Sequence, residues 1–163
     1  MEFDSLNVFP DFVWVNPREV FPRELIDLED EVNYPSWKEP DFLEFLFDKG
    51  CFAYLVKAGI KVVGYYAYRL NTDSIEIVKF CFKQLAHTEQ IKHQTMKHIK
   101  GKLRVNRRKS ILLNLREDDS IMAFFLKTED FTSRLLKNHF PKMVGVVGGT
   151  NQDAYQFEYS LKV

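Results

Sequence analysis

The sequence predicts an α/β fold in which helices cover both faces of a mainly antiparallel sheet of about seven strands. Three observations lead to this prediction. Hydrophobic residues make up 45% of the chain and include 15 Phe and 7 Tyr, which suits a compact core. Three strand-like segments follow one another over residues 51–83 and are joined by short turns. A helical segment and another apolar strand come next, an order typical of a β-α-β unit with one parallel pair.

Length and composition limit the class of protein. We expect residues 1–163 to form one domain, with residues 1–11 as an N-terminal arm. No apolar run approaches the ~18–20 residues of a membrane-spanning helix, and the acidic start does not resemble a secretory signal. Two cysteines, Cys51 and Cys81, are too few for a disulfide framework. We therefore expect reduced thiols and a cytoplasmic protein.

The N-terminal third predicts one strand and two helices. The aromatic and β-branched run Phe12–Val15 is typical of a strand. A helix is expected over residues 22–33, because Pro22 suits a first helical position and acidic residues follow it. Pro40 begins a second helix with a broad apolar face, and Gly50 ends it.

The middle of the chain predicts an antiparallel meander followed by a helix. Strands are expected at Cys51–Lys57, Ile60–Leu70 and Ile75–Lys83, since both connections contain turn residues. Thr88 or Thr95 is expected to cap the helix that follows, whose apolar residues recur at helical spacing.

The C-terminal third predicts a strand, a helix and a closing pair of strands. Residues 111–115 form a compact apolar strand, and Asp119 caps the helix that follows. Residues 133–140 are expected to be a short helix or irregular. The closing strands are expected at 144–147 and 155–161, around two turn glycines.

This order of elements resembles that of the GNAT superfamily of N-acyltransferases over roughly residues 12–162. The segment Tyr34–Trp37, with Phe42 and Leu46 after it, is similar to the N-terminal pattern of ribosomal-protein alanine acetyltransferases. Residues Val62–Tyr65 resemble a strand pattern found across the superfamily. Further along, Leu113–Phe131 follows the spacing of its strand and helix near the acyl donor.

The resemblance implies transfer of an acyl group, expected to be acetyl from acetyl-CoA, to an amine acceptor. The donor would lie where the last strand of the meander separates from the parallel strand beside it. The pantetheine arm would bind along that strand at Phe80 and Phe82. The pyrophosphate would bind at the start of the next helix, where free N–H groups favour anions. On spacing, the phosphate loop falls on His87, Thr88, Glu89, Gln90, Ile91 and Lys92.

Several motif positions depart from the superfamily pattern. Gln90 and Lys92 stand where the phosphate loop has glycine, although Lys92 offers a direct cation. A second register that starts at Gln90 lacks both glycines as well. Asn114 replaces the Glu of the strand motif, Leu126 replaces the Tyr that serves as acid, and Asp130 replaces a glycine. Neither Asn114 nor Leu126 can transfer a proton.

One carboxylate keeps a useful position. Glu76 matches the general base of histone-type members, and burial on a sheet face would raise its pKa. The alternative is a solvent-facing residue of an alternating strand. Tyr155 and Tyr159 are candidates for the missing acid or simply packing residues.

Charge is unevenly distributed along a chain of zero net charge. Residues 1–50 hold 13 acidic and 4 basic side chains, whereas residues 92–109 hold five Lys, three Arg, two His and no acid. The basic segment is interpreted as a solvated helix face, as a surface that steers CoA phosphates, or as a nucleic-acid interface. The acidic residues 29–31 are interpreted as a solvated helix face or as the border of a site for a cationic acceptor.

Three functions follow from these patterns. The first is an acyl-CoA-dependent N-acyltransferase with Glu76 as base, acting directly or through a water. The second is a catalytically inactive GNAT-like binding or scaffold protein. The third, less favoured, is a polyanion or nucleic-acid binder that uses residues 92–109. No zinc-ligand spacing is present, and nothing orients Cys81 with His87 or His93 as a thiol catalyst.

Overall fold

Seven strands and four helices make up the part of the chain that this computed structural model describes, residues 9–33, 36–116, 119–140 and 152–161. The strands are β1 (Asp11–Trp14), β2 (Cys51–Ala58), β3 (Lys61–Leu70), β4 (Ser74–Phe82), β5 (Ser110–Arg116), β6 (Thr132–Phe140) and β7 (Gln152–Ser160). The helices are α1 (Arg23–Val32), α2 (Glu39–Phe47), α3 (Thr88–Val105) and α4 (Ser120–Thr128). Within these ranges no helix is both long enough and apolar enough to cross a bilayer.

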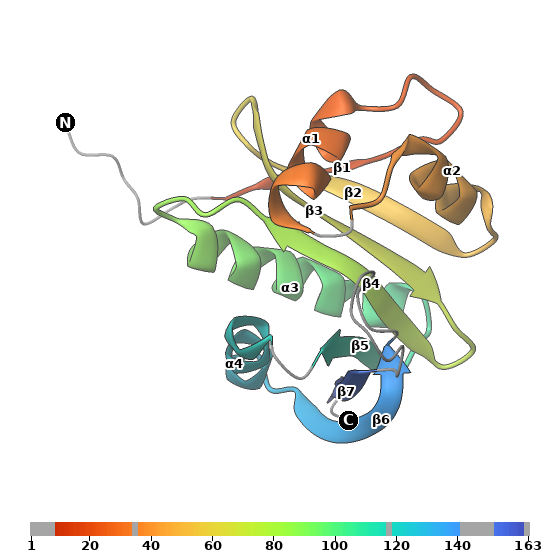
Figure 1. Ribbon diagram of the computed structural model, residues 1–163, viewed down its shortest axis with the longest axis vertical. Helices are drawn as coiled ribbons and strands as arrows, with labels where there is room; N and C mark the ends of the chain where they lie inside the picture. Colours follow the sequence, from red (N-terminus) through yellow and green to blue (C-terminus); the bar gives the residue numbers. More distant parts are fainter. Residues whose placement is uncertain (1–8, 34–35, 117–118, 141–151, 162–163) are drawn as a thin grey trace.

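The strands form one sheet in the order β1-β2-β3-β4-β5-β7-β6 (Figure 1). Strands β4 and β5 are parallel, in register from Ser74 opposite Ser110 to Ile77 opposite Leu113. The other neighbouring pairs are antiparallel. The α/β class, the β2-β3-β4 meander and the parallel pair joined through α3 are thus confirmed.

An extra residue in β4 interrupts the pairing with β3. Ala67 lies opposite Lys79 and Tyr68 lies opposite Ile77, so Val78 is left between them without a partner in β3. Such a bulge bends the strand and shifts the alternation of its side chains by one residue. The parallel ladder to β5 ends at this same point, at Ile77. Beyond the bulge, β4 therefore separates from β5.

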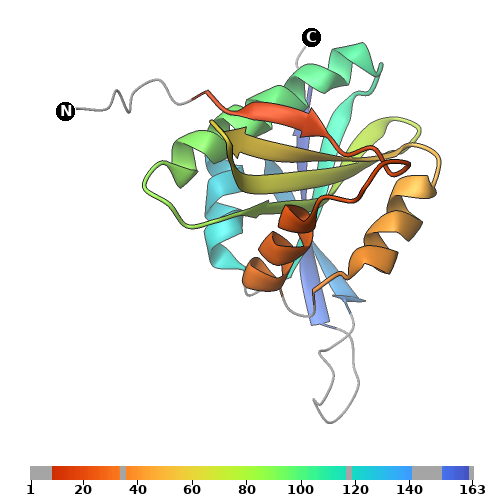
Figure 2. The same cartoon turned by 90° about the horizontal axis from the view of Figure 1, so that it is seen from above.

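The sheet separates two hydrophobic cores. Helices α3 and α4 lie on one face and α1 and α2 on the other (Figures 1 and 2). The bulge decides which core each later β4 residue joins. Ile77, Phe80 and Phe82 pack with the core under α3 and α4. Cys81 packs with the core under α1 and α2, and Lys79 reaches the same side to contact α1.

Several residues that favour helix ends or turns occupy such positions in the structure. Pro40 lies in the first turn of α2, and the Asp119 carboxylate accepts a hydrogen bond from the Met122 N–H at 3.2 Å to cap α4. The prediction that Thr88 or Thr95 is the N-cap of α3 is wrong, because His87 takes that position, Thr88 is the first helical residue and Thr95 lies inside the helix. Gly59, in the turn between β2 and β3, has a φ of +66°.

The prediction for residues 133–140 is wrong. They belong to β6, which pairs antiparallel with β7 from Thr132 opposite Glu158 to Phe140 opposite Gln152. Adjacent Leu135 and Leu136 break the period-2 pattern, so the strand depends on its ladder with β7 and not on local alternation. The strand expected at 144–147 and its glycines lie outside the described residues, as do residues 1–8 of the expected arm.

Candidate functional site

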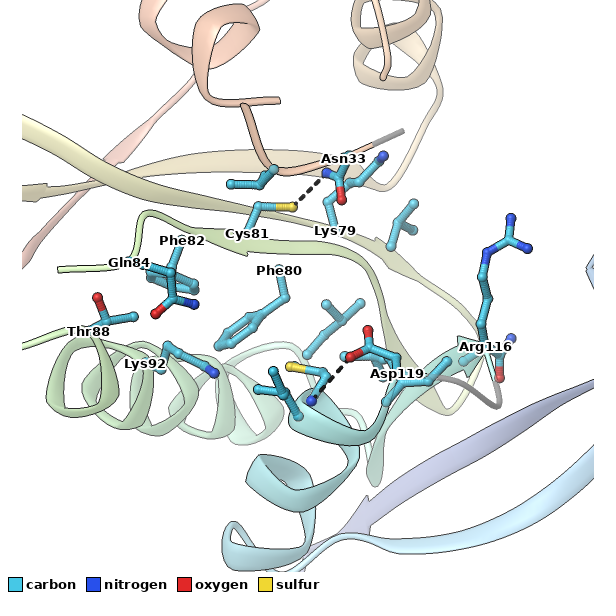
Figure 3. Close-up of a pocket in the computed structure, with 18 residues that line it drawn as sticks. Asn33, Lys79, Phe80, Cys81, Phe82, Gln84, Thr88, Lys92, Arg116 and Asp119 are labelled. Atoms are coloured by element: carbon cyan, nitrogen blue, oxygen red, sulfur yellow. Dashed lines mark hydrogen bonds between the residues drawn. The ribbon is translucent and has the colours of Figure 1, made fainter. Parts of the chain in front are cut away.

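A cleft opens where β4 separates from β5. Its volume is about 610 Å³, and its lining comes from β4, β5, the end of α1 and the starts of α3 and α4. Figure 3 shows Phe80 in the middle, Lys92 and Thr88 towards α3, and Asn33 and Lys79 towards α1. Among the described residues, the charged lining consists of Lys79, Lys92, Arg116 and Asp119. The lining thus holds three cations and one carboxylate, which favours an anionic ligand.

The start of α3 forms one end of the cleft. The Thr88 hydroxyl accepts a hydrogen bond from the Leu85 N–H at 2.6 Å and lies 2.7 Å from the Lys83 carbonyl oxygen, to which it donates. These bonds fix the turn that leads into the helix. Lys92 lies one turn further on, with its ammonium 4.6 Å from the centre of the Phe125 ring and 3.5 Å from a Glu89 carboxylate oxygen. The Lys92 side chain is only 8% exposed, so its cation belongs to the cleft and not to the outer surface.

The structure brings together half of the predicted donor-binding residues. Phe80, Phe82, Thr88 and Lys92 line the cleft. The other four predicted residues, His87, Glu89, Gln90 and Ile91, are not part of its lining. Ile91 is buried in the core under α3, and Gln90 and Glu89 are exposed.

Glu76 lies before the bulge and outside the lining of the cleft. Its carboxylate is 3.5 Å from the Arg69 guanidinium and accepts a hydrogen bond from the Asn71 amide at 3.3 Å. The side chain is 28% exposed. Its role as general base stays a prediction, and the route for a proton from the cleft would have to include water.

A buried carboxylate supports the wall of the cleft nearest α1. Glu29 is completely buried and has donors on both carboxylate oxygens. The Asn33 amide donates to it at 2.6 Å, the Trp37 N–H at 2.9 Å and the Lys79 ammonium at 2.8 Å, and the Tyr65 hydroxyl donates as well. Two of these donors, Asn33 and Lys79, line the cleft.

Electrostatics keep Glu29 ionised. Burial alone would raise the pKa of its carboxyl, but the hydrogen bonds from Lys79, Trp37 and Tyr65 outweigh burial and hold the pKa below its usual range. Burial raises the pKa of the Tyr65 hydroxyl and of the Cys81 thiol. The Asn33 amide donates to the Cys81 sulfur at 3.1 Å (Figure 3). The Tyr65 hydroxyl and the Cys81 thiol therefore stay protonated at neutral pH.

The charge pattern of the sequence does not reveal this network, because Glu29 is one of three consecutive acids whose run predicts a solvated helix face. That interpretation is wrong for Glu29 and right for Asp30, whose side chain is 47% exposed and pairs with Lys38. Helical spacing holds the missing signal. Glu29 follows Leu25 by four positions, so it lies on the buried face of α1 with Leu25 and Leu28.

Only some of the basic side chains of residues 92–109 are free to form a charged surface. Lys100 donates to the Glu129 carbonyl oxygen at 2.8 Å, and the Lys102 ammonium lies 4.3 Å from the centre of the Tyr54 ring. The Arg108 guanidinium donates to two backbone carbonyl oxygens. With Lys92 in the cleft, much of the charge therefore has internal partners. In the described ranges no three His, Cys, Asp or Glu side chains are grouped as metal ligands.

Comparison with known proteins rests on structure. No family model matches the sequence, and no curated protein matches it significantly. The ribosomal-protein-S18-alanine N-acetyltransferase of Escherichia coli superposes with a TM-score of 0.76 at 10% identity, over 95% of this chain and 96% of that one. A GNAT family acetyltransferase from Elizabethkingia anophelis with acetyl-CoA bound gives 0.70 at 15% identity, over 93% and 98%. A Bacillus subtilis acetyltransferase in complex with CoA gives 0.71 at 16% identity, over 94% and 99%. The chain has the GNAT fold.

The structure places the two residues that the sequence resemblance put at the proton-transfer positions, Leu126 and Asn114. Leu126 of α4 is fully buried in the core under α3, so no group at this position faces the cleft. Asn114 of β5 lines the cleft and offers an amide in place of a carboxylate. Tyr155 and Tyr159, the predicted substitutes for the acid, do not line the cleft. Tyr159 packs on Phe131, with 5.7 Å between ring centres.

The cleft nevertheless suits acyl-CoA as a ligand of this GNAT fold. Its lining combines apolar side chains of β4 and β5, such as Ile77 and Leu113, with cationic and amide groups. Lys92 and the start of α3 would hold phosphates, and the edge of β4 that has no strand partner after Ile77 among the described residues would hold the amide groups of the pantetheine arm. Gln90 leaves the cleft open because its side chain lies on the exposed face of α3.

Proposed function

We propose that the protein transfers an acyl group, acetyl first among the candidates, from acyl-CoA to an amine. The separation of β4 from β5 after Ile77 carries this proposal. It leaves one edge of β4 without a strand partner among the described residues. Peptide groups on a free edge bind extended amide chains in the way that a neighbouring strand does. The pantetheine arm of CoA is such a chain.

Lys92 supports the phosphate end of the proposed site. Glycines in a phosphate loop let backbone amides approach closely, whereas here a buried ammonium one turn into α3 would supply the charge directly. Thr88 would hold the preceding turn in place through its backbone hydrogen bonds.

Glu76 remains the proposed base for the acceptor amine, acting through water. Its carboxylate lies on the sheet face nearest α1 and α2, where Arg69 also contacts the ring of Phe45. Glu76→Gln is expected to reduce turnover by ~10²-fold with little change in acyl-CoA affinity. Unchanged turnover in this variant would exclude the role.

Thermal unfolding with and without millimolar acetyl-CoA tests the proposal. A ligand at ~100 times its Kd adds about 2.7 kcal/mol to the free energy of unfolding, which raises Tm by several degrees. We expect this rise in the wild type and in Lys97→Met, and a much smaller one in Lys92→Met. Lys97 is the matched control because it is an exposed lysine of the same helix. No rise in the wild type at saturating concentrations would overturn the proposal.

A non-catalytic acyl-CoA-binding protein is the second candidate. The buried Leu126, where the superfamily has its acid, favours it. Release of free CoA thiol in the presence of a panel of primary amines separates the two candidates, because only the enzyme turns over. The free, buried thiols of Cys51 and Cys81 support the proposal that either protein works in the cytoplasm.

A further inference from the structure

The cationic end of a buried ion pair lies at the wall of the cleft nearest α1. Lys79 is the first β4 residue after the bulge, and its ammonium lies 2.8 Å from a Glu29 carboxylate oxygen. Glu29 is completely buried, whereas the Lys79 side chain is 15% exposed and lines the cleft. The pair is therefore a fixed dipole with its positive end towards the cleft.

The ammonium of Lys79 is held firmly and keeps donors to spare. The Trp37 ring lies over it, with 4.6 Å from the nitrogen to the ring centre. Of its three N–H groups, one hydrogen bond, to Glu29, is made within the described residues. The thiol of Cys81, on the same side of β4, is kept neutral by burial and offers no competing charge.

We infer that Lys79 stabilises the thiolate that leaves acyl-CoA, in place of the acid that Leu126 cannot provide. The inference rests on the proposed acyl-CoA site. In the transfer, the acceptor nitrogen forms a bond to the acyl carbon, the C–S bond breaks, and sulfur leaves with the bonding electron pair. The amine gives its proton to solvent or to a base. Lys79 need not transfer a proton, because a fixed positive charge lowers the energy of the departing anion directly.

Orientation of Lys79 depends on Glu29. Without that carboxylate, the long and flexible lysine chain would lose its fixed position beside Trp37. Glu29 is thus a positioning residue in this inference, because it acts through Lys79 and is itself shielded from the cleft.

The pH dependence of CoA binding tests the inference without any turnover. Free CoA carries a thiol that ionises at alkaline pH, whereas acetyl-CoA carries none, so acetyl-CoA is the reference for every other titrating group. If Lys79 lowers the pKa of the bound thiol by about one unit, CoA affinity relative to acetyl-CoA rises severalfold from pH 7 into the range where the free thiol ionises, towards a limit of about tenfold. Calorimetric titration of both ligands at each pH measures the ratio.

Three variants make the test specific. Lys79→Arg keeps the cation and is expected to keep the rise in the ratio, whereas Lys79→Met is expected to give a flat ratio. The double variant Glu29→Gln/Lys79→Met removes both charges, and it too is expected to give a flat ratio should Lys79→Met alone fail to fold. A flat ratio in the wild type, with acetyl-CoA still bound, would overturn the inference and leave the proposed function standing. Absence of binding by both ligands would instead overturn the proposed function.

Discussion

Gly64 of β3 lies directly against the ring of Phe82 at the end of β4. A Cβ atom at this position would be 2.6 Å from a ring carbon of Phe82 and 2.8 Å from the backbone oxygen of Cys81. Such distances are shorter than van der Waals contact, and the Cys81 oxygen is fixed by the strand. The absence of a side chain at Gly64 therefore lets β4 lie where it forms one wall of the cleft.

Alanine substitutions at two glycines should have opposite effects. Gly64→Ala forces β4 away from β3, and we expect it to lower the free energy of unfolding by about 1–3 kcal/mol and to weaken acetyl-CoA binding. Gly101→Ala lies inside α3 with no atom within 4 Å of its new Cβ, and we expect it to raise that free energy by about 0.5–1 kcal/mol. Urea unfolding of both variants checks this, and a neutral Gly64→Ala would contradict the close packing.

Loss of the Glu29 charge should destabilise the fold. Glu29→Gln leaves the largely buried Lys79 without a counter-charge, and we expect a loss of about 3 kcal/mol at pH 7. The lowered pKa of Glu29 means that its stabilisation is complete above its ordinary pKa of 4.5 and is lost as the pH falls through the lower folded value. The difference between variant and wild type in urea unfolding should therefore shrink below pH 4.5.

Asp30→Asn is the matched control for Glu29→Gln. Asp30 is the next residue of the same helix, but its carboxylate is exposed and pairs with the exposed Lys38. We expect little or no change in the free energy of unfolding, because solvent screens an exposed ion pair. Equal losses in the two variants would mean that helix charge, and not the buried network, is responsible.

His98 should make the protein sensitive to mild acid. Burial, with a smaller contribution from nearby Lys102, lowers the pKa of its imidazole from 6.5 to about 4. The unfolded chain then binds more protons than the folded one between these values, so stability falls as the pH is lowered from 6.5 to 4. We expect a loss of about 1–2 kcal/mol from this residue in urea unfolding.

A phenylalanine at position 98 should remove that sensitivity. The His98 ring is stacked on Phe12, with 4.0 Å between ring centres and 15° between planes, and a phenylalanine ring preserves this contact. His98→Phe should therefore show a much flatter stability profile from pH 6.5 to 4. A profile parallel to that of the wild type would assign the acid sensitivity to other groups.

Asp130 occupies a backbone conformation that favours glycine. Its φ is +69°, in the left-handed region, just after α4. Asp130→Gly should raise the free energy of unfolding by about 0.5–1 kcal/mol, and Asp130→Ala should lower it. Both changes are measurable by thermal unfolding, and a stabilising alanine would contradict the argument.

The same position shows what the sequence can and cannot reveal. The resemblance to the superfamily placed a glycine at 130, and the structure keeps the backbone that needs one although the side chain has changed. The meander, the parallel pair and the α4 cap follow from local patterns that survive in this chain. Strand β6 has no such local pattern, and its extended conformation depends on the hydrogen-bonded pairing with β7.

The candidate site is less visible in the sequence, for a physical reason. The sequence predicts that Lys92 and Thr88 belong to the site, because both lie at the start of α3 and the start of a helix is marked by local patterns. The network of Glu29, Asn33 and Lys79 joins residues up to 50 positions apart, and it forms only after α1 packs on the sheet. Charge runs in the sequence cannot separate the buried Glu29 from its exposed neighbours unless helix phase is considered as well.

The unpaired residue Val78 determines on which face of the sheet each later side chain of β4 stands. If Val78 instead took a regular place in the ladder with β3, every later β4 side chain would stand on the opposite face of the sheet. Phenylalanines would then face α1 and its buried carboxylate, and a lysine and a cysteine would face the hydrophobic core under α3. One residue without a partner in β3 thus gives the two walls of the cleft their different chemical character.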